Sequence, residues 1–282
     1  MEVFDYIFYT SFYPDLKDMS SDEAHRHFLT CGKKEKRVCN KRMLQEFQDE
    51  IKLKITEEYE NLDIEKISLQ GEKISLQGEK ISLQGEKMFN VLIRTSNRPE
   101  GFMRCIESVL YQKYTNYKIY VCHDKIESLD YLDTFNDKIE YFPVFTKSNE
   151  KYKFNLYCNH LLEKVDDGYV IFLDDDDMFC HDQVFNILNY CMDDESLLIW
   201  KFFRPDKLIF PASMKHINLG EVDTTSFCSN IKNYENCKWG DKKNGDFCFI
   251  NQVIEKNMPK IKLLDKILTK TQFVDKIGNL GN

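Results

Sequence analysis

Four consecutive aspartates, Asp174 to Asp177, follow the apolar run YVIFL. Neighbouring carboxylates repel each other, by about 4 kcal/mol for a pair ~4 Å apart at an effective dielectric constant of about 20. An exposed turn would relieve this repulsion, but apolar residues flank the run on both sides and place it at the rim of a folded core. Asp174 and Asp176 would project to the same side of an extended chain. We therefore predict a hard-oxygen site for Mg²⁺ or Mn²⁺ at these two residues, completed by substrate phosphates.

Two other apolar runs also end in polar residues. FNVLIRT leads into SNRP, and YKIYVCH leads into Asp124. Thr95, Ser96 and Arg98 could hold a nucleotide through hydrogen bonds and through charge on its diphosphate, although an ordinary loop between a strand and a helix uses the same residue types. Asp124 could accept a hydrogen bond from a base or a ribose, or it could cap the next helix.

These loops converge if the runs before them are neighbouring strands. Strands are predicted at residues 89–95, 117–123, 139–145, 169–173 and 197–203. Between the first two strands, a segment opened by Pro99 places four apolar residues on one helical face, namely Phe102, Ile106, Val109 and Leu110. This alternation indicates an α/β fold with a mostly parallel sheet flanked by helices. Ligands of such sheets bind outside the carboxyl ends of the strands.

The strand ends resemble those of family 2 glycosyltransferases of GT-A (Rossmann-like) fold. The resemblance rests on NVLIRTSNRP, on HD after the second strand and on GYVIFLDDDDMF, and it covers about residues 88–250. It implies that the first strand and its loop hold the nucleotide, that Asp124 contacts the base, and that Asp174 and Asp176 form a metal-binding DXD motif in which Asp174 also faces the nucleotide. Asn159 stands where the family often has an Asn. CHDKIES departs from the commoner DDGS after the second strand.

The resemblance also implies a catalytic base some tens of residues beyond the DXD motif, after an aromatic residue. Asp246 fits best, because it follows Trp239 and Gly245; Asp241 and Asp223 are the competing candidates. The implied reaction is an inverting, hexosyl-type transfer from a nucleotide-diphospho sugar, with a UDP-sugar favoured, and with Mn²⁺ or Mg²⁺ as cofactor. The acceptor would be a hydroxyl of a glycan, a protein or a small molecule.

Two other functions compete with glycosyl transfer. A nucleotidyltransferase would also need a metal and a nucleotide, but it usually carries a Gly-rich, basic phosphate loop that TSNRPEG does not resemble. A non-catalytic scaffold or virion protein built on a coiled-coil helix would explain the N-terminal half and leave the four aspartates unexplained.

The N-terminal region, residues 1–66, is predicted to be helical. Ser20 and Glu23 form a capping-box pattern, and Gly32 ends the helix that begins there. The stretch from FDYIFYTSFYPDLKD to EAHRHFLTCGKKEKR resembles a helical module attached to some glycosyltransferases. We expect His27 to pack in a small core, and we do not expect it to bind a metal together with His25.

A charged helix is predicted over residues 38–66. Its apolar residues recur at a spacing of four, namely Met43, Phe47, Ile51, Ile55 and Tyr59. The stripe could pack locally or pair with a second copy of the chain, and the pattern favours neither.

The heptapeptide ISLQGEK then occurs three times, at residues 67–73, 74–80 and 81–87. Its apolar residues do not form a coiled-coil seam, and each glycine costs about 1 kcal/mol in a helix interior. We predict a polar linker, which divides the chain into a helical module (1–66), a linker (67–87) and a GT-A domain (88–282).

Composition and charge indicate which partners and which cellular compartment to expect for the protein. The chain has 282 residues with a net charge of −8, which disfavours a nucleic-acid partner. Its ten cysteines include no CxxC pair and no zinc-type spacing, so reduced thiols are expected. The sequence shows no signal peptide and no apolar run of membrane-spanning length. We therefore expect a cytoplasmic protein.

Overall fold

The structure is a computed structural model that describes residues 4–12, 16–34, 37, 39–43, 46, 86–145, 150–204, 209–215 and 217–271. The chain divides into two units, one within residues 1–62 and one that holds residues 63–205 and 209–282. Most of the predicted helix over 38–66 and nearly all of the repeat lie outside the described residues. The linker, self-association and domain boundaries therefore stay predictions.

The first unit contains the helices α1 (Tyr6–Phe12) and α2 (Ser21–His27). The capping box of α2 is present, since the Ser20 and Glu23 side chains bond each other's backbone N–H, and the helical segment ends at Gly32 as predicted. The small apolar core comprises Phe8, Tyr9, Leu16, Ala24, Phe28 and Cys39. His27 lies 3.1 Å from the Tyr9 hydroxyl through its Nδ1 atom, so its ring lies against this core.

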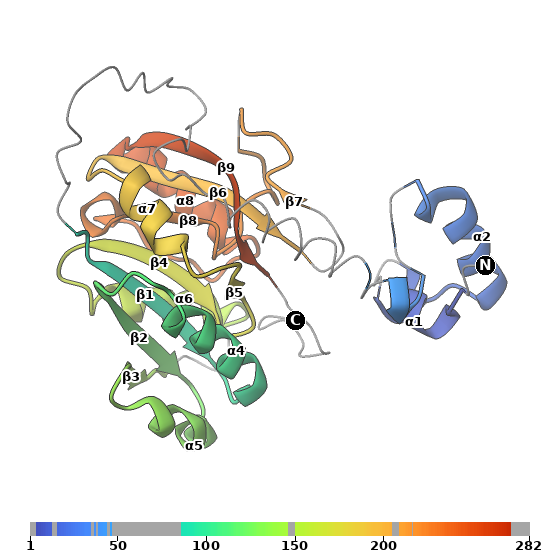
Figure 1. Cartoon of the computed structure of the whole chain (residues 1–282), viewed down its shortest axis with the longest axis horizontal. Coiled ribbons are helices and arrows are strands. Elements are labelled where there is room, and N and C mark those ends of the chain that lie inside the picture. The colour runs from blue at the N-terminus through green and yellow to red at the C-terminus, as the bar shows by residue number, and fades with distance from the viewer. Residues whose placement is uncertain are drawn as a thin grey trace. The chain divides into compact units, whose positions relative to one another are not determined.

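The described residues of the second unit form a nine-stranded sheet with helices on both faces (Figure 1). Its strands are β1 (Phe89–Thr95), β2 (Tyr117–His123), β3 (Glu140–Pro143), β4 (Tyr169–Asp174), β5 (Met178–Phe179), β6 (Ser196–Phe203), β7 (Ile209–Phe210), β8 (Phe227–Asn230) and β9 (Lys260–Lys270). Its helices are α4 (Pro99–Leu110), α5 (Leu129–Leu132), α6 (Lys153–Leu162), α7 (Val184–Cys191) and α8 (Gly245–Asn257). The strand order is β3-β2-β1-β4-β8-β6-β9-β5, and β7 pairs with β6.

The sheet is parallel in one half and mixed in the other. β3, β2, β1 and β4 are parallel neighbours, as expected from the alternation of strands and helices. β8 runs antiparallel to both β4 and β6, and β9 runs parallel to β6. β1 and β2 occupy the predicted ranges, and β3 is shorter than predicted. The antiparallel strand β8 has no separate signal in the sequence, because it is only four residues long.

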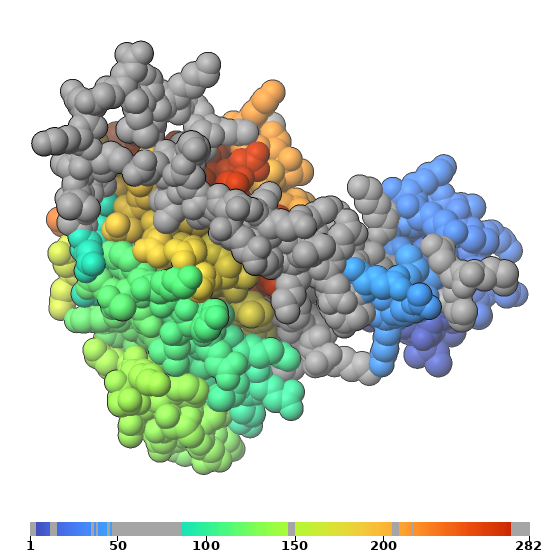
Figure 2. Space-filling model, viewed as in Figure 1, coloured from blue at the N-terminus to red at the C-terminus, as the bar shows by residue number. Residues whose placement is uncertain are grey.

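Each face of the sheet is covered by its own pair of helices. α6 and α8 pack on the face that carries Leu92 and Phe172. α4 buries Phe102, Ile106 and Val109 of its predicted apolar face, whereas Leu110 is only half-buried. α7 places Phe185 in a stacked contact with Phe89 of β1, with ring centroids 5.5 Å apart. α4 and α7 are both visible at the surface in Figure 2. Within the described part of the chain, none of the helices is long and apolar enough to cross a membrane.

Candidate active site

Three parallel strands end at the same edge of the sheet. In the register of the strands, Thr95 of β1 lies beside His123 of β2, and Arg94 lies beside Asp174 of β4. The loops after these strands therefore meet, which is the arrangement that the sequence predicts for a ligand site.

The acidic run forms a tight turn at the end of β4. The backbone N–H of Asp177 donates to the carbonyl oxygen of Asp174 at 2.9 Å. Asp175 and Asp177 are buried, whereas the side chains of Asp174 and Asp176 keep 18% and 11% of their surface exposed. The two residues predicted to bind a metal are therefore the accessible members of the run.

Two arginines neutralise part of the charge of this turn. Arg94 donates through Nε and Nη2 to the two oxygens of Asp174, at 2.6 and 2.7 Å. Arg98 donates to Asp175 and, through Nη1, to Asp176 at 2.9 Å. Burial acts to lower the pKa of both guanidinium groups, but the neighbouring carboxylates outweigh it, and each pKa is raised above its ordinary value. Both arginines therefore stay charged.

Asp175 anchors the turn in the interior. The Thr95 hydroxyl donates to it at 2.6 Å and lies 2.7 Å from the Tyr131 hydroxyl. Burial raises the pKa of Asp175 to about 7, although Arg98 and Thr95 act to lower it. Thr95 is fully buried, so in this structure its hydroxyl holds the acidic turn.

Gly101 allows the first turn of α4 to touch the acidic turn. A Cβ atom at position 101 would lie 2.9 Å from the carbonyl oxygen of Asp175 and 3.6 Å from the Cα atom of Asp176. The first distance is shorter than real Cβ contacts, so only glycine permits this approach. The helix therefore supports the backbone on which the accessible aspartates stand.

Asp124 lies at the end of β2, as predicted, and is paired with a lysine. Lys153, at the start of α6, donates to its Oδ2 atom at 2.8 Å. Burial acts to raise the pKa of Asp124, but the hydrogen bond from Lys153 and the nearby Ser96 and Tyr157 hydroxyls outweigh it and lower this pKa. The structure thus brings Ser96 and Asp124 together, with the carboxylate ionised.

The antiparallel strand β8 brings a further carboxylate to the acidic turn. Because β8 pairs with β4 in the opposite direction, the turn before β8 lies near the carboxyl end of β4. Asp223 belongs to this turn. Burial raises the pKa of Asp223 to about 7, and the charges of Asp246 and Asp174 act in the same direction. Three acidic side chains that are far apart in the sequence therefore repel one another at one place.

Asp246 is the second residue of α8. Its Oδ1 atom accepts a hydrogen bond from the N–H of Phe247 at 2.7 Å. Burial raises the pKa of Asp246 to about 6, Phe247 and Arg94 act to lower it, and Asp174 acts to raise it. A carboxyl group with a pKa near neutrality can both accept and release a proton at physiological pH.

Asp241, a competing candidate for the base, has a different environment. Its exposed carboxylate accepts hydrogen bonds from the backbone N–H groups of Lys151, at 3.2 Å, and of Tyr152. These two residues directly precede α6, so Asp241 holds the start of that helix. A carboxylate near the first turn of a helix also interacts favourably with the positive end of the helix dipole.

Asn159 and Asn155 project from α6 toward the segment that contains Asp241. Asn159 exchanges two hydrogen bonds with the backbone of Trp239, at 2.9 and 2.8 Å, and this is the Asn that the family resemblance singles out. Asn155 carries no signal of its own in the sequence, and Arg94 lies within the motif NVLIRTSNRP without an expected role. Arg94 has one signal, a charge inside the otherwise apolar run FNVLIRT.

The family comparison agrees with this geometry. A family model described as glycosyl transferase family 2 matches residues 90–256, more than half of the chain. The chain belongs to glycosyl transferase family 2. The matched range contains the acidic turn, Asp124, Asp223 and Asp246, so the family resemblance seen in the sequence is confirmed.

Solved structures of other glycosyltransferases share the fold of this family member. TarS 1–349 of S. aureus in complex with UDP-GlcNAc has a TM-score of 0.53 at 15% identity, over 68% of this chain and 60% of that chain. The mannosyltransferase PcManGT from Pyrobaculum calidifontis, in complex with GDP-Man and Mn²⁺, has a TM-score of 0.51 at 10% identity, over 69% and 59%. The chain thus spans about 60% of the length of these structures. No curated protein sequence matches it.

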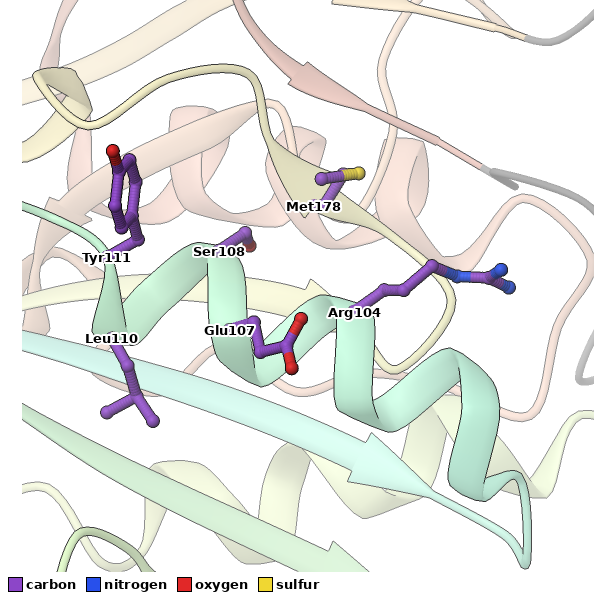
Figure 3. A pocket seen from close by; sticks show the side chains of 6 residues that line it. All are labelled: Arg104, Glu107, Ser108, Leu110, Tyr111 and Met178. Atoms are coloured by element: carbon purple, nitrogen blue, oxygen red, sulfur yellow. The ribbon is translucent and has the colours of Figure 1, made fainter.

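Two surface hollows lie beside the helices of this fold. A groove of about 500 Å³ runs along α4 and is lined by Arg104, Glu107, Ser108, Leu110, Tyr111 and Met178 (Figure 3). A second hollow of about 360 Å³ lies beside α6, and its lining includes Asn159 and Lys238. Neither lining includes an aspartate of the acidic turn, Asp223 or Asp246.

Proposed function

We propose that the chain transfers a sugar, with inversion, from a nucleotide-diphospho sugar to an acceptor hydroxyl. The observation that carries the proposal is the meeting of the acidic turn with Asp223 and Asp246 at the carboxyl edge of the sheet of a family 2 glycosyltransferase. The site combines two accessible carboxylates, which could hold a cation for the charged donor, with buried carboxyl groups of near-neutral pKa, among them Asp246.

The nucleotide would lie over the ends of β1 and β2. Ser96 and the ionised Asp124 would face the base and the ribose, and Arg98 and Asp174 would lie toward the diphosphate. Thr95 would act indirectly, by holding Asp175. A UDP-sugar is the favoured donor. TarS binds UDP-GlcNAc and PcManGT binds GDP-Man, so nucleotide-sugar binding occurs on this fold.

The acidic turn fits a divalent cation that arrives with the donor. Asp174 and Asp176 supply hard oxygens, and burial together with the charge of Asp174 raises the pKa of Asp176 despite Arg98. In the described part of the chain, no group of three or more acidic, His or Cys side chains could hold an ion by itself. Mg²⁺ commonly uses only one or two carboxylates plus substrate phosphates. A bound Mn²⁺ or Mg²⁺ would offset the charge that develops on the leaving diphosphate.

Asp246 would act as the general base. It would take the proton of the acceptor hydroxyl while that oxygen attacks the anomeric carbon from the face opposite the diphosphate. The bond from the anomeric carbon to the diphosphate oxygen breaks, and the configuration inverts. Asp223 would hold a proton beside Asp246, since the two carboxyl groups repel each other when both are ionised. The pair would therefore titrate as one unit.

The remaining assignments rest on the sequence. The family match favours glycosyl transfer over nucleotidyl transfer and over a scaffold role. The acceptor would be a glycan, a protein or a small molecule, in the cytoplasm. Any self-association would use the helix predicted over residues 38–66.

Thermal-shift measurements with UDP, GDP and the matching triphosphates, with and without Mn²⁺, test the proposal. We expect a diphosphate to stabilise the parent protein only when Mn²⁺ is present, and Asp176→Asn to weaken this effect and to abolish turnover. Asp166→Asn is the control, because Asp166 is exposed and lies before β4, at the opposite edge of the sheet. A preference for triphosphates would favour nucleotidyl transfer, and parental turnover in EDTA would contradict the metal assignment.

A further inference from the structure

Asn155 occupies a junction between three parts of the second unit. It lies in the first turn of α6, where its Oδ1 atom accepts a hydrogen bond from Nη1 of Arg94 at 3.3 Å. Its Nδ2 group donates to the carbonyl oxygen of Lys242 at 2.8 Å and to that of Gly240 at 3.4 Å. One amide group therefore joins β1, α6 and the segment before α8.

That segment, residues 239–244, leads directly into the helix that carries Asp246. Three side-chain attachments connect it to α6: Asn159 to Trp239, Asn155 to Gly240 and Lys242, and Asp241 to the residues before α6. Asn155 differs from the other two because it also contacts Arg94. Arg94 in turn holds both oxygens of Asp174.

Asn155 also touches the first residue of α8. A Cβ atom at Gly245 would lie 2.3 Å from Nδ2 of Asn155 and 2.7 Å from its Cγ atom. The backbone of Gly245 therefore packs directly on the amide, one residue before Asp246. Any sideways shift of the start of α8 toward α6 meets this contact.

We propose that Asn155 is a positioning residue. It would set the distance between Asp174, the carboxylate on the side of the nucleotide-sugar donor, and the general base Asp246. The inference rests on the proposed function and adds a residue to it. The amide acts in both directions, since its oxygen accepts from a guanidinium while its nitrogen donates to two carbonyl groups. Arg94, Asn155 and the loop thereby form one continuous connection between the two ends of the site.

The isosteric variant Asn155→Asp separates the two halves of this connection. A carboxylate keeps an acceptor for Arg94 but places a second oxygen against the carbonyl groups of Gly240 and Lys242. Asn155→Leu removes both halves. If the loop contacts matter, both variants are impaired, and if only the contact with Arg94 matters, Asn155→Asp behaves like the parent.

The control is Asn257→Leu. Asn257 is the last residue of α8, and its amide also donates to two carbonyl oxygens, those of Asn233 at 2.9 Å and Glu235 at 3.0 Å. Its loss removes the same number of main-chain contacts at the opposite end of the helix. A merely structural role of Asn155 would lower the melting temperature as Asn257→Leu does and leave turnover unchanged.

Two measurements on the full chain test the inference. The first is hydrogen exchange of the backbone between residues 239 and 246, which should become several-fold faster in both Asn155 variants and stay parental in Asn257→Leu. The second is turnover of UDP-GlcNAc and of GDP-Man with Mn²⁺. There kcat should fall about 10–100-fold, since small misplacement of reacting groups has effects of this size, while KM for the donor changes less than about threefold.

The outcomes separate this inference from the proposed function. If the parent protein turns over neither donor, the exchange measurement still decides whether Asn155 holds the loop. Parental exchange in Asn155→Leu overturns the inference, and so does parental kcat in a parent that is active. Suppose instead that exchange is faster in the Asn155 variants and the parent has neither transferase nor donor-hydrolysis activity. Asn155 would then still hold the loop before α8, and the proposed function would be contradicted.

Discussion

Arg94 and Asp174 are direct neighbours across the parallel strands β1 and β4, and two hydrogen bonds join their side chains. The two residues are 80 positions apart in the chain. Their pairing places a permanent positive charge under the carboxylate that we assign to the donor. It also connects that carboxylate, through Asn155, to the segment that leads to Asp246.

Removing the arginine should destabilise the fold. The side chains of Arg94 and Asp174 are only 8% and 18% exposed, and breaking a buried pair by removing one partner costs about 3–5 kcal/mol. We expect Arg94→Met to lower the free energy of unfolding in urea by about 3 kcal/mol. Lys113→Met is the control, because the side chain of Lys113 is 64% exposed in its pair with Asp182, and solvent-exposed pairs contribute about 1 kcal/mol or less. Equal effects of the two variants would contradict the assigned importance of the pair.

Adding a methyl group at Gly101 should displace the acidic turn. The new Cβ atom would meet the carbonyl oxygen of Asp175 at 2.9 Å, and backbone cannot move aside as a flexible side chain can. We expect Gly101→Ala to weaken Mn²⁺-dependent nucleotide binding at least tenfold in calorimetric titrations. Gly240→Ala is the steric control, since the atom nearest to its Cβ would be the Cγ atom of the Lys242 side chain, at an ordinary contact distance of 3.6 Å. Unchanged nucleotide affinity in Gly101→Ala would show that α4 does not support the turn.

Protonation of Asp246 should set the acidic limb of the pH profile. The pKa of Asp246 is about 6, and a general base acts only when deprotonated, so kcat/KM should rise between pH 5 and pH 7. We expect Asp246→Asn to reduce kcat by about 10²–10⁴-fold and to keep donor binding. A near-parental rate in this variant, combined with a loss in Asp241→Asn or Asp223→Asn, would assign the base to one of those residues.

Asp223 should make stability depend on pH in the opposite sense from an ion-paired carboxylate. Its pKa is about 7 in the folded protein and about 3.9 in an unfolded chain. The carboxyl group therefore contributes stability that is fully present below about pH 4 and is lost as the pH rises through 7. In EDTA, Asp223→Asn should raise the melting temperature relative to the parent more at pH 8 than at pH 5. A difference that is the same at both pH values would show that Asp223 does not take up a proton on folding.

The domain boundaries predicted from the repeat can be tested by deletion. Because ISLQGEK forms no apolar seam and carries a glycine in each copy, removal of one or two copies should leave the second unit folded and active. Differential scanning calorimetry of the shortened chains is the measurement. A marked loss of thermal stability would show that the repeat is packed structure.

The local pattern of the sequence determined the parallel half of the fold. β1 and β2 lie where their apolar runs predict them, and α4 begins at Pro99 and buries three of the four apolar residues of its predicted face. The acidic turn could also be located, because four carboxylates directly after a buried strand have no place in a core. These signals reside within about ten residues of chain, which is the range over which strand and helix periodicity acts.

Only the tertiary structure decided which charges meet. Asp223 reaches the acidic turn because the short strand β8 runs antiparallel to β4, and Arg94 reaches Asp174 because of the register of β1 and β4. The contact between Asn155 and Gly245 joins segments about 90 residues apart in sequence, which no local pattern encodes. The raised pKa values of Asp223 and Asp246 have the same origin: burial and mutual repulsion arise only after folding has brought these carboxyl groups together.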